Sequence, residues 1–190
     1  NLLLNWAETD NHKTLVAAAM GYGHCVVCQT PIDVNMAKQL NILATNLGLA
    51  PDRIIIDPLT GGLGYGLEYT YSVMERIRVA ALTGDSMLQM PMLVTPGYET
   101  SRSREVKAHV DQDGCPGPRA ALVEVAAAMS LLNAGADLLV LYHPLSIRTV
   151  LAKIREMTPC EHVPPEGGGK EVGNSVSVGE GRRGVPVEVR

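Results

Sequence analysis

A repeated order of segments constrains the fold of this chain more than any other feature of its sequence. Short apolar runs typical of strands alternate with longer amphipathic runs typical of helices, at a spacing of roughly thirty residues. Five such units can be traced between residues 1 and 157. Units of this kind place their strands parallel in one sheet and their helices against it. The sequence therefore predicts an α/β fold.

The expected strands are short and mostly apolar. They cover residues 2–5, 25–29, 53–57, 92–95 and 137–142. The expected helices follow them, over residues 11–22, 33–47, 67–82, 119–133 and 147–157. Asp33 is placed to cap the second helix, and Gly48 follows it where a left-handed residue belongs. We expect residues 95–117 to form a long polar loop.

Five units fit either a doubly wound sheet or part of a (β/α) barrel. Polar residues, Gly and Pro follow nearly every expected strand, and a barrel gathers such loops on the rim where its binding site lies. An open sheet would concentrate them at a switch point instead. We predict a TIM-like (β/α) barrel represented by about five of eight units over residues 1–157, with the missing units upstream. Residues 158–190 are interpreted as a Gly/Pro-rich tail with little structure of its own.

Composition excludes some classes of protein. The net charge of −4 argues against a nucleic-acid partner. No run reaches the roughly 18 apolar residues of a membrane span, and no signal peptide is recognisable at the start, so we expect no membrane and a cytoplasmic location.

Four cysteines invite a metal or disulfide interpretation: Cys25, Cys28, Cys115 and Cys160. The first two are three positions apart on an expected strand, so their side chains point to opposite faces and are poorly placed to share one ion. We interpret them as buried, reduced structural cysteines rather than cluster ligands.

The densest motif follows the third expected strand, where residues 61–66 read Gly-Gly-Leu-Gly-Tyr-Gly. Its four glycines would let the backbone approach a bulky ligand, and N–H groups at the following helix start would suit an anion. The spacing does not match a Rossmann fingerprint, and no lysine of a P-loop follows. A glycine-rich loop without any ligand remains the alternative.

Other polar residues near the strand ends have ordinary structural explanations. Asp33 and Asp57 could be acid–base groups, but capping of helices is favoured. His143, before Pro144, is more often a capping or packing residue than a ligand. The charged residues of segment 95–104 could contact a phosphate or a partner, but solvation is favoured; they are Glu99, Arg102 and Arg104.

Three stretches carry a resemblance to a known family. Residues 30–41 read Thr-Pro-Ile-Asp-Val-Asn-Met-Ala-Lys-Gln-Leu-Asn, and residues 60–78 join the glycine motif to Met-Glu-Arg-Ile-Arg. Residues 134–137, followed by a strand and His143-Pro144, form the third. Together they resemble the small (delta) subunit of the corrinoid iron–sulfur protein, from the CO dehydrogenase/acetyl-CoA synthase complex, also called acetyl-CoA decarbonylase/synthase. The resemblance covers residues 1–157.

This resemblance implies a barrel subunit paired with a large (gamma) subunit that bears an iron–sulfur cluster. A cobamide shared by the two would receive a methyl group through a methyltransferase that uses a methyltetrahydropterin, and acetyl-CoA synthase would accept it. It implies no catalytic residue and no metal ligand in this chain. By position on the rim, the cobamide contacts would be Asn5, Thr30, Thr60, Gly61, Gly62, Leu63, Gly64, Tyr65, Gly66 and His143.

Two other functions stay open on the residues alone. The chain could be a pterin-binding barrel methyltransferase, for which Asn5, Asn35 and Asp57 are candidates. It could instead be a scaffold without a ligand. The glycine loop favours a ligand over a scaffold, and the lack of a dense acid–base cluster favours cofactor handling over independent catalysis, so whether the chain is an enzyme stays uncertain.

Overall fold

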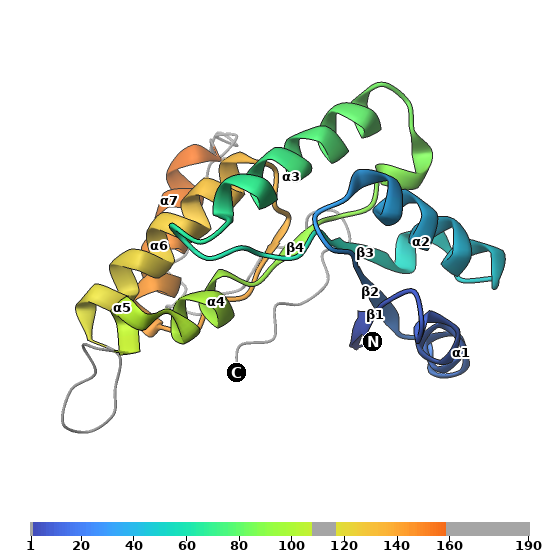
Figure 1. The fold of residues 1–190 in the computed structure, drawn as a ribbon, viewed down its shortest axis with the longest axis horizontal. Coiled ribbons are helices and arrows are strands. Elements are labelled where there is room, and N and C mark those ends of the chain that lie inside the picture. The colour runs from blue at the N-terminus through green and yellow to red at the C-terminus, as the bar shows by residue number, and fades with distance from the viewer. Residues whose placement is uncertain (1, 108–116, 159–190) are drawn as a thin grey trace, which may run out of the picture.

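The strands form one parallel arc in chain order. The computed structural model describes residues 2–107 and 117–158. Its strands are β1 (Leu3–Ala7), β2 (Cys25–Gln29), β3 (Ile54–Asp57), β4 (Leu93–Val94) and β5 (Leu138–Leu139). The first three pair in the order β1-β2-β3, and β4 pairs with β5. A parallel bridge between Ile56 and Met92 joins the two sheets into the sequence 1-2-3-4-5 (Figure 1).

This order decides between the two predicted architectures. In a doubly wound sheet the chain reverses direction and places its first strand in the middle. Here each strand lies beside its neighbour in sequence, as in a segment of a (β/α) barrel. The predicted TIM-like partial barrel is therefore confirmed over the described residues.

Seven α-helices connect and cover these strands in the described part of the chain. They are α1 (His12–Tyr22), α2 (Val34–Asn46), α3 (Leu67–Leu82), α4 (Pro96–Arg102), α5 (Arg104–Lys107), α6 (Pro118–Asn133) and α7 (Pro144–Met157). Short 3₁₀ turns occur at Pro51–Arg53 and Ser86–Leu88. Figure 1 shows α1 and α2 beside β1–β3, while α6 and α7 lie at the other end of the molecule.

The two faces of the arc bury different residues. On β2, Val26 and Cys28 belong to the main core between strands and helices, whereas Cys25 and Val27 belong to a second apolar cluster. Cys25 and Cys28 are both buried thiols on opposite faces, as predicted. Burial raises the pKa of Cys28 to about 12. Cys115 and Cys160 lie outside the described residues.

Several helix ends match the sequence prediction. Asp33 Oδ1 accepts a hydrogen bond from Met36 N at 2.9 Å and so caps α2. Gly48 is left-handed, with φ 101°. His143 caps α7, because its Nδ1 accepts from Leu145 N at 3.1 Å. The capping interpretations of Asp33 and His143 are therefore confirmed.

The loop predicted for residues 95–117 is wrong in its first part. Residues 96–102 form α4 and residues 104–107 form α5. Pro96 occupies the first turn of α4, where its missing N–H costs no helical hydrogen bond. Both helices are too short to show an apolar period, which hid them in the sequence. Of the tail predicted for 158–190, only Thr158 lies within the described residues.

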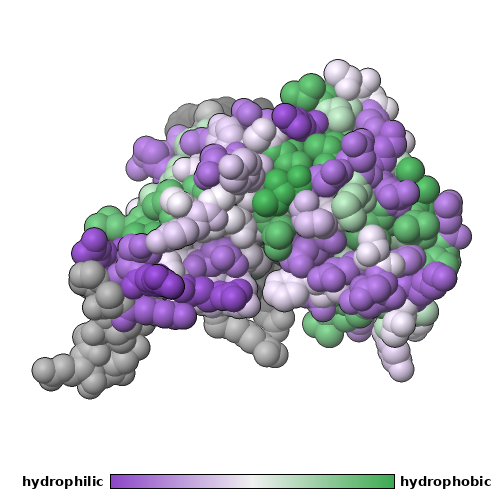
Figure 2. All heavy atoms as spheres, viewed as in Figure 1, coloured by the Kyte–Doolittle hydropathy of each residue, from purple (hydrophilic) through white to green (hydrophobic). Residues whose placement is uncertain are grey.

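The surface is mixed in character. Figure 2 shows hydrophilic residues over most of one face, interrupted by apolar groups near its centre. Among the described helices, none is long and apolar enough to cross a membrane.

Candidate functional site

The glycine loop between β3 and α3 is fixed to its own helix. Thr70, buried in the first turns of α3, accepts a hydrogen bond from Gly61 N at 2.8 Å and donates to Leu59 O at 2.9 Å. Thr60 Oγ1 accepts from Thr95 N at 2.8 Å, which ties the loop to the end of β4. The loop is thus held from two sides.

Close backbone packing explains two of the glycines. A Cβ at Gly61 would lie 2.4 Å from the carbonyl carbon and oxygen of Gly66, which no real side chain tolerates. Gly66 itself has φ 108°, in the left-handed region that favours glycine. Gly62 O accepts from Tyr65 N and Leu67 N at 2.9 and 3.1 Å. Gly61 and Gly66 are therefore needed for the conformation of the loop itself. The N–H groups of Gly61, Tyr65 and of Leu67 at the start of α3 already donate within the protein, so they are not available to a ligand.

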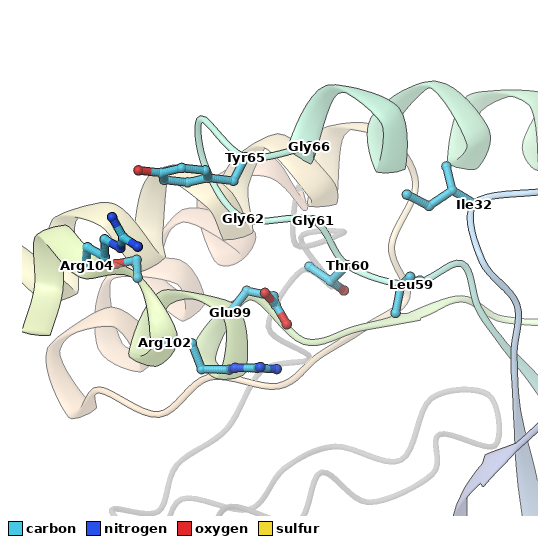
Figure 3. Close-up of a pocket in the computed structure, with 11 residues that line it drawn as sticks. Ile32, Leu59, Thr60, Gly61, Gly62, Tyr65, Gly66, Glu99, Arg102 and Arg104 are labelled. Carbon is cyan, nitrogen blue, oxygen red and sulfur yellow. The ribbon is translucent and has the colours of Figure 1, made fainter.

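An open cavity of about 670 Å³ lies against this loop. One wall comes from the loop: Leu59, Thr60, Gly61, Gly62, Tyr65 and Gly66. The other side is lined by Ile32, Glu99, Arg102, Ser103 and Arg104. Figure 3 shows Tyr65 and Arg104 toward one end of the cavity, and Ile32 and Leu59 toward the other. A wall in which three of six residues are glycines thus faces one that carries charged side chains.

The charged wall is positioned by contacts within α4 and to α5. The Arg102 guanidinium lies over the Tyr98 ring, 5.0 Å from its centroid, and its Nη1 donates to the Tyr98 hydroxyl at 3.1 Å. Tyr65 OH donates to Glu105 Oε1 at 2.9 Å, linking the loop to α5, and this hydrogen bond raises the pKa of Tyr65. With two arginines and one glutamate lining it, the cavity presents net positive charge.

The structure gathers half of the predicted contact residues. Thr60, Gly61, Gly62, Tyr65 and Gly66 line the cavity. The other five do not: Leu63 and Gly64 are exposed at the loop tip, Asn5 is exposed on β1, Thr30 lines a second cavity, and His143 caps α7. The role of each as a cofactor contact stays a prediction.

Sequence reasoning assigned the residues of the opposite wall to solvent. Arg102 is indeed exposed and Glu99 is half-buried, and these two residues, three positions apart on α4, also line the open cavity. The signal that could have found them was Pro96 followed by charges at helical spacing.

Asp57, at the end of β3, is fully buried. Its Oδ2 accepts from Gln29 Nε2 and its Oδ1 from Leu59 N, both at 2.9 Å. Burial raises the pKa of Asp57, and these two hydrogen bonds oppose the rise. The nearby Trp6 indole N–H also opposes the rise in the pKa of Asp57, although it makes no hydrogen bond to the carboxylate in the described structure. Asp57 therefore shapes the loop after β3, and the prediction that it caps a helix is wrong, since α3 begins only at Leu67.

The candidates for a pterin site do not come together. Asn5 and Asn35 are exposed, Asp57 is buried, and none of the three lines either cavity.

Comparison with known proteins places the chain among subunits of one complex. A family model described as CO dehydrogenase/acetyl-CoA synthase delta subunit matches residues 1–158. Acetyl-CoA decarbonylase/synthase complex subunit delta of Methanopyrus kandleri is 38% identical over 151 residues, covering 79% of this chain. Subunit delta 1 of Methanosarcina thermophila is 40% identical over 161 residues, covering 82%. The chain spans 37% of the length of each of these two relatives.

A solved structure bears on the fold alone. Dihydropteroate synthase from Stenotrophomonas maltophilia aligns with a TM-score of 0.50 at 19% identity, covering 79% of this chain and 58% of that one. At this identity the likeness supports the partial barrel and says nothing of the ligand. From the family match and the two close relatives, the chain belongs to the CO dehydrogenase/acetyl-CoA synthase delta subunit family.

Proposed function

We propose that this chain is the part of a delta subunit that helps to hold a cobamide while methyl groups pass between a methyltetrahydropterin methyltransferase and acetyl-CoA synthase, in the synthesis or cleavage of acetyl-CoA. Its partners would be a large (gamma) subunit with an iron–sulfur cluster, the methyltransferase and acetyl-CoA synthase, in a cytoplasmic complex. The corrinoid supplies the methyl-carrying chemistry when bound, and this chain binds and orients it.

The cavity at the glycine loop is the observation that carries the proposal. A cobamide is a broad macrocycle with a phosphate in its nucleotide tail. Backbone without a side chain, as at Gly62, lets a flat ring approach closely. Arg102 and Arg104 on the opposite wall are suited to a phosphate, with which arginine forms charge-assisted hydrogen bonds. The residues present therefore fit the group.

The size of the cavity supports sharing between subunits. Its 670 Å³ lies within the roughly 300–1,000 Å³ typical of small-ligand pockets, and a cobamide exceeds a typical small ligand in bulk. One face of the cofactor would therefore rest here while a partner subunit covers the other.

The test is the corrinoid content of the intact complex, purified without oxygen and measured by its ultraviolet–visible spectrum. Gly61→Ala places a Cβ 2.4 Å from the Gly66 backbone, so we expect at least a tenfold loss of bound corrinoid. Gly21→Ala is the matched control, because a Cβ there meets no atom within 4 Å. Arg102→Gln together with Arg104→Gln tests the charged wall without touching the loop, and we expect about a tenfold weaker affinity for cyanocobalamin.

Each other outcome counts against the proposal. Full corrinoid content in both the loop and the arginine variants would leave the chain as a scaffold. A colourless protein that binds a methyltetrahydropterin would instead favour the methyltransferase.

A further inference from the structure

A second cavity, of about 280 Å³, adjoins the first on the same rim. It lies among the loops that follow β1, β2 and β3, and Leu59 borders both cavities. A ligand large enough to extend past Leu59 would therefore meet the second cavity as well.

Thr30, which lines this cavity, carries an unsatisfied polar group. Its side chain is 1% exposed, and its Oγ1 has no hydrogen-bond partner among the described residues. Its backbone is fixed, because Thr30 N donates to Asp57 O at 3.0 Å and Thr30 O accepts from Ile32 N at 2.9 Å. The hydroxyl therefore cannot reach water by a simple shift of the residue. A buried hydroxyl left unpaired is costly, and a group entering the cavity would satisfy it.

The neighbouring polar groups define the chemistry of that entering group. Gln29 Nε2 is committed to Asp57, so the carbonyl end of the same amide is directed away from Asp57. Glu8 adds a carboxylate, and no lysine or arginine lines the cavity. An anionic ligand is therefore disfavoured. The set of a hydroxyl, an amide oxygen and a carboxylate fits a neutral group that offers N–H donors next to one acceptor.

We propose that this cavity receives a primary carboxamide side chain of the cobamide held at the glycine loop. Thr30 would donate its hydroxyl proton to the amide oxygen, while Gln29 and Glu8 would accept from the amide nitrogen. Met36 and Leu59 supply apolar surface for the methylene carbons of the side chain. This inference rests on the proposed function, since the corrinoid must bind at the first cavity for its side chain to reach the second.

Three corrinoid probes separate this contact from the rest of the site. Cyanocobalamin carries the phosphate and the carboxamides, dicyanocobinamide keeps the carboxamides without the phosphate, and the dicyanocobyrinic heptamethyl ester has neither. Their affinities are measured by spectroscopic titration of the intact, corrinoid-depleted complex. Thr30→Val should weaken all three probes by the same factor, about tenfold, because the ester carbonyl also accepts from the hydroxyl, whereas Arg102→Gln together with Arg104→Gln should weaken cyanocobalamin alone. Thr30→Ser keeps the hydroxyl and should restore most of the affinity.

Stability provides a second readout. Because Thr30 Oγ1 makes no hydrogen bond in the described structure, Thr30→Val should not lower the unfolding temperature of the corrinoid-depleted complex. Thr149→Val, on the exposed side of α7, controls for the threonine-to-valine change and should leave all three affinities unchanged.

The inference is overturned if Thr30→Val weakens cyanocobalamin alone, weakens none of the probes, or destabilises the depleted complex. If the unmodified complex binds no probe, the proposed function itself fails. The two failures are therefore distinguishable.

Discussion

Replacement of Glu124 by Gln tests what holds the rim after β5 in place. Glu124 is 2% exposed on α6, and its carboxylate spans two backbone donors at the end of that strand. Its Oε1 accepts from Tyr142 N at 2.5 Å and its Oε2 from His143 N at 3.0 Å. Glutamine keeps one acceptor but turns an NH₂ group toward the second backbone N–H.

The expected cost follows from those two contacts. A hydrogen bond to a charged group contributes roughly 1.5–3 kcal/mol, and leaving a buried donor unpaired adds a penalty of similar size. Glutamine loses one charge-assisted bond and weakens the other. We therefore expect Glu124→Gln to lower the free energy of unfolding by about 2–4 kcal/mol.

Urea unfolding of the intact protein gives the total, and amide hydrogen exchange gives the location. The amides of Tyr142 and His143 should lose more protection than those of β2. Glu156→Gln is the control, because Glu156 is exposed on the surface of α7 and forms a surface ion pair with Lys153. If Glu124→Gln were as stable as the Glu156→Gln control and left exchange at Tyr142 and His143 unchanged, the idea that Glu124 holds this rim in place would be refuted.

Three further outcomes are expected. Gly97→Ala should lower the free energy of unfolding by about 1–3 kcal/mol in urea titration, since its Cβ would lie 2.7 Å from Glu124 Oε1 and 2.8 Å from Tyr142 N; a neutral result would contradict that packing. Cys28, with its pKa at about 12, should not react with a thiol-specific dye at about pH 8 until the protein unfolds, and rapid labelling of the folded protein would exclude this. Burial raises the pKa of Asp57, so the folded state favours the protonated form and stability should fall as pH rises through the interval between the ordinary and the raised values. Asp57→Asn should flatten that part of the stability profile measured between about pH 4 and 8, whereas an unchanged slope would assign it to another group.

The repeating units were predictable because their signals are local. Residues 67–82 match α3 at both ends, where Gly66 precedes an amphipathic run of full helical length. The lengths of the last two strands were less predictable. Residues 92–95 and 137–142 were expected to be strands, but β4 covers Leu93–Val94 and β5 covers Leu138–Leu139. Strand length depends on how far a partner extends beside it, and the sequence of one segment does not contain that information.

The candidate site likewise has one part that the sequence predicts and one part that it does not. The glycine loop is visible in the sequence because close backbone approach selects glycine directly, as at Gly61. The facing wall is not visible in the sequence, because charged residues such as Glu99 and Arg102 are equally typical of a surface that contacts only water. Only the tertiary arrangement of α4 against the loop turns them into a lining. The unpaired hydroxyl of Thr30 is likewise a property of its surroundings rather than of its residue type.

Two residues in unusual backbone conformations show that the rim is set by the fold. Ile32 and Leu59 have φ of 49° and 64°, which cost roughly 1–3 kcal/mol each for residues other than glycine, and both line the first cavity. Such conformations persist only where neighbours hold them. Leu59 N donates to Asp57 Oδ1, Leu59 O accepts from Thr70, and Ile32 N donates to Thr30 O. Since all these contacts lie within the protein, the apolar part of the wall is formed before any ligand binds. On the proposed function, selectivity among ligands would then come from groups outside this framework: the arginine N–H groups of the facing wall that Tyr98 does not hold, and the hydroxyl of Thr30.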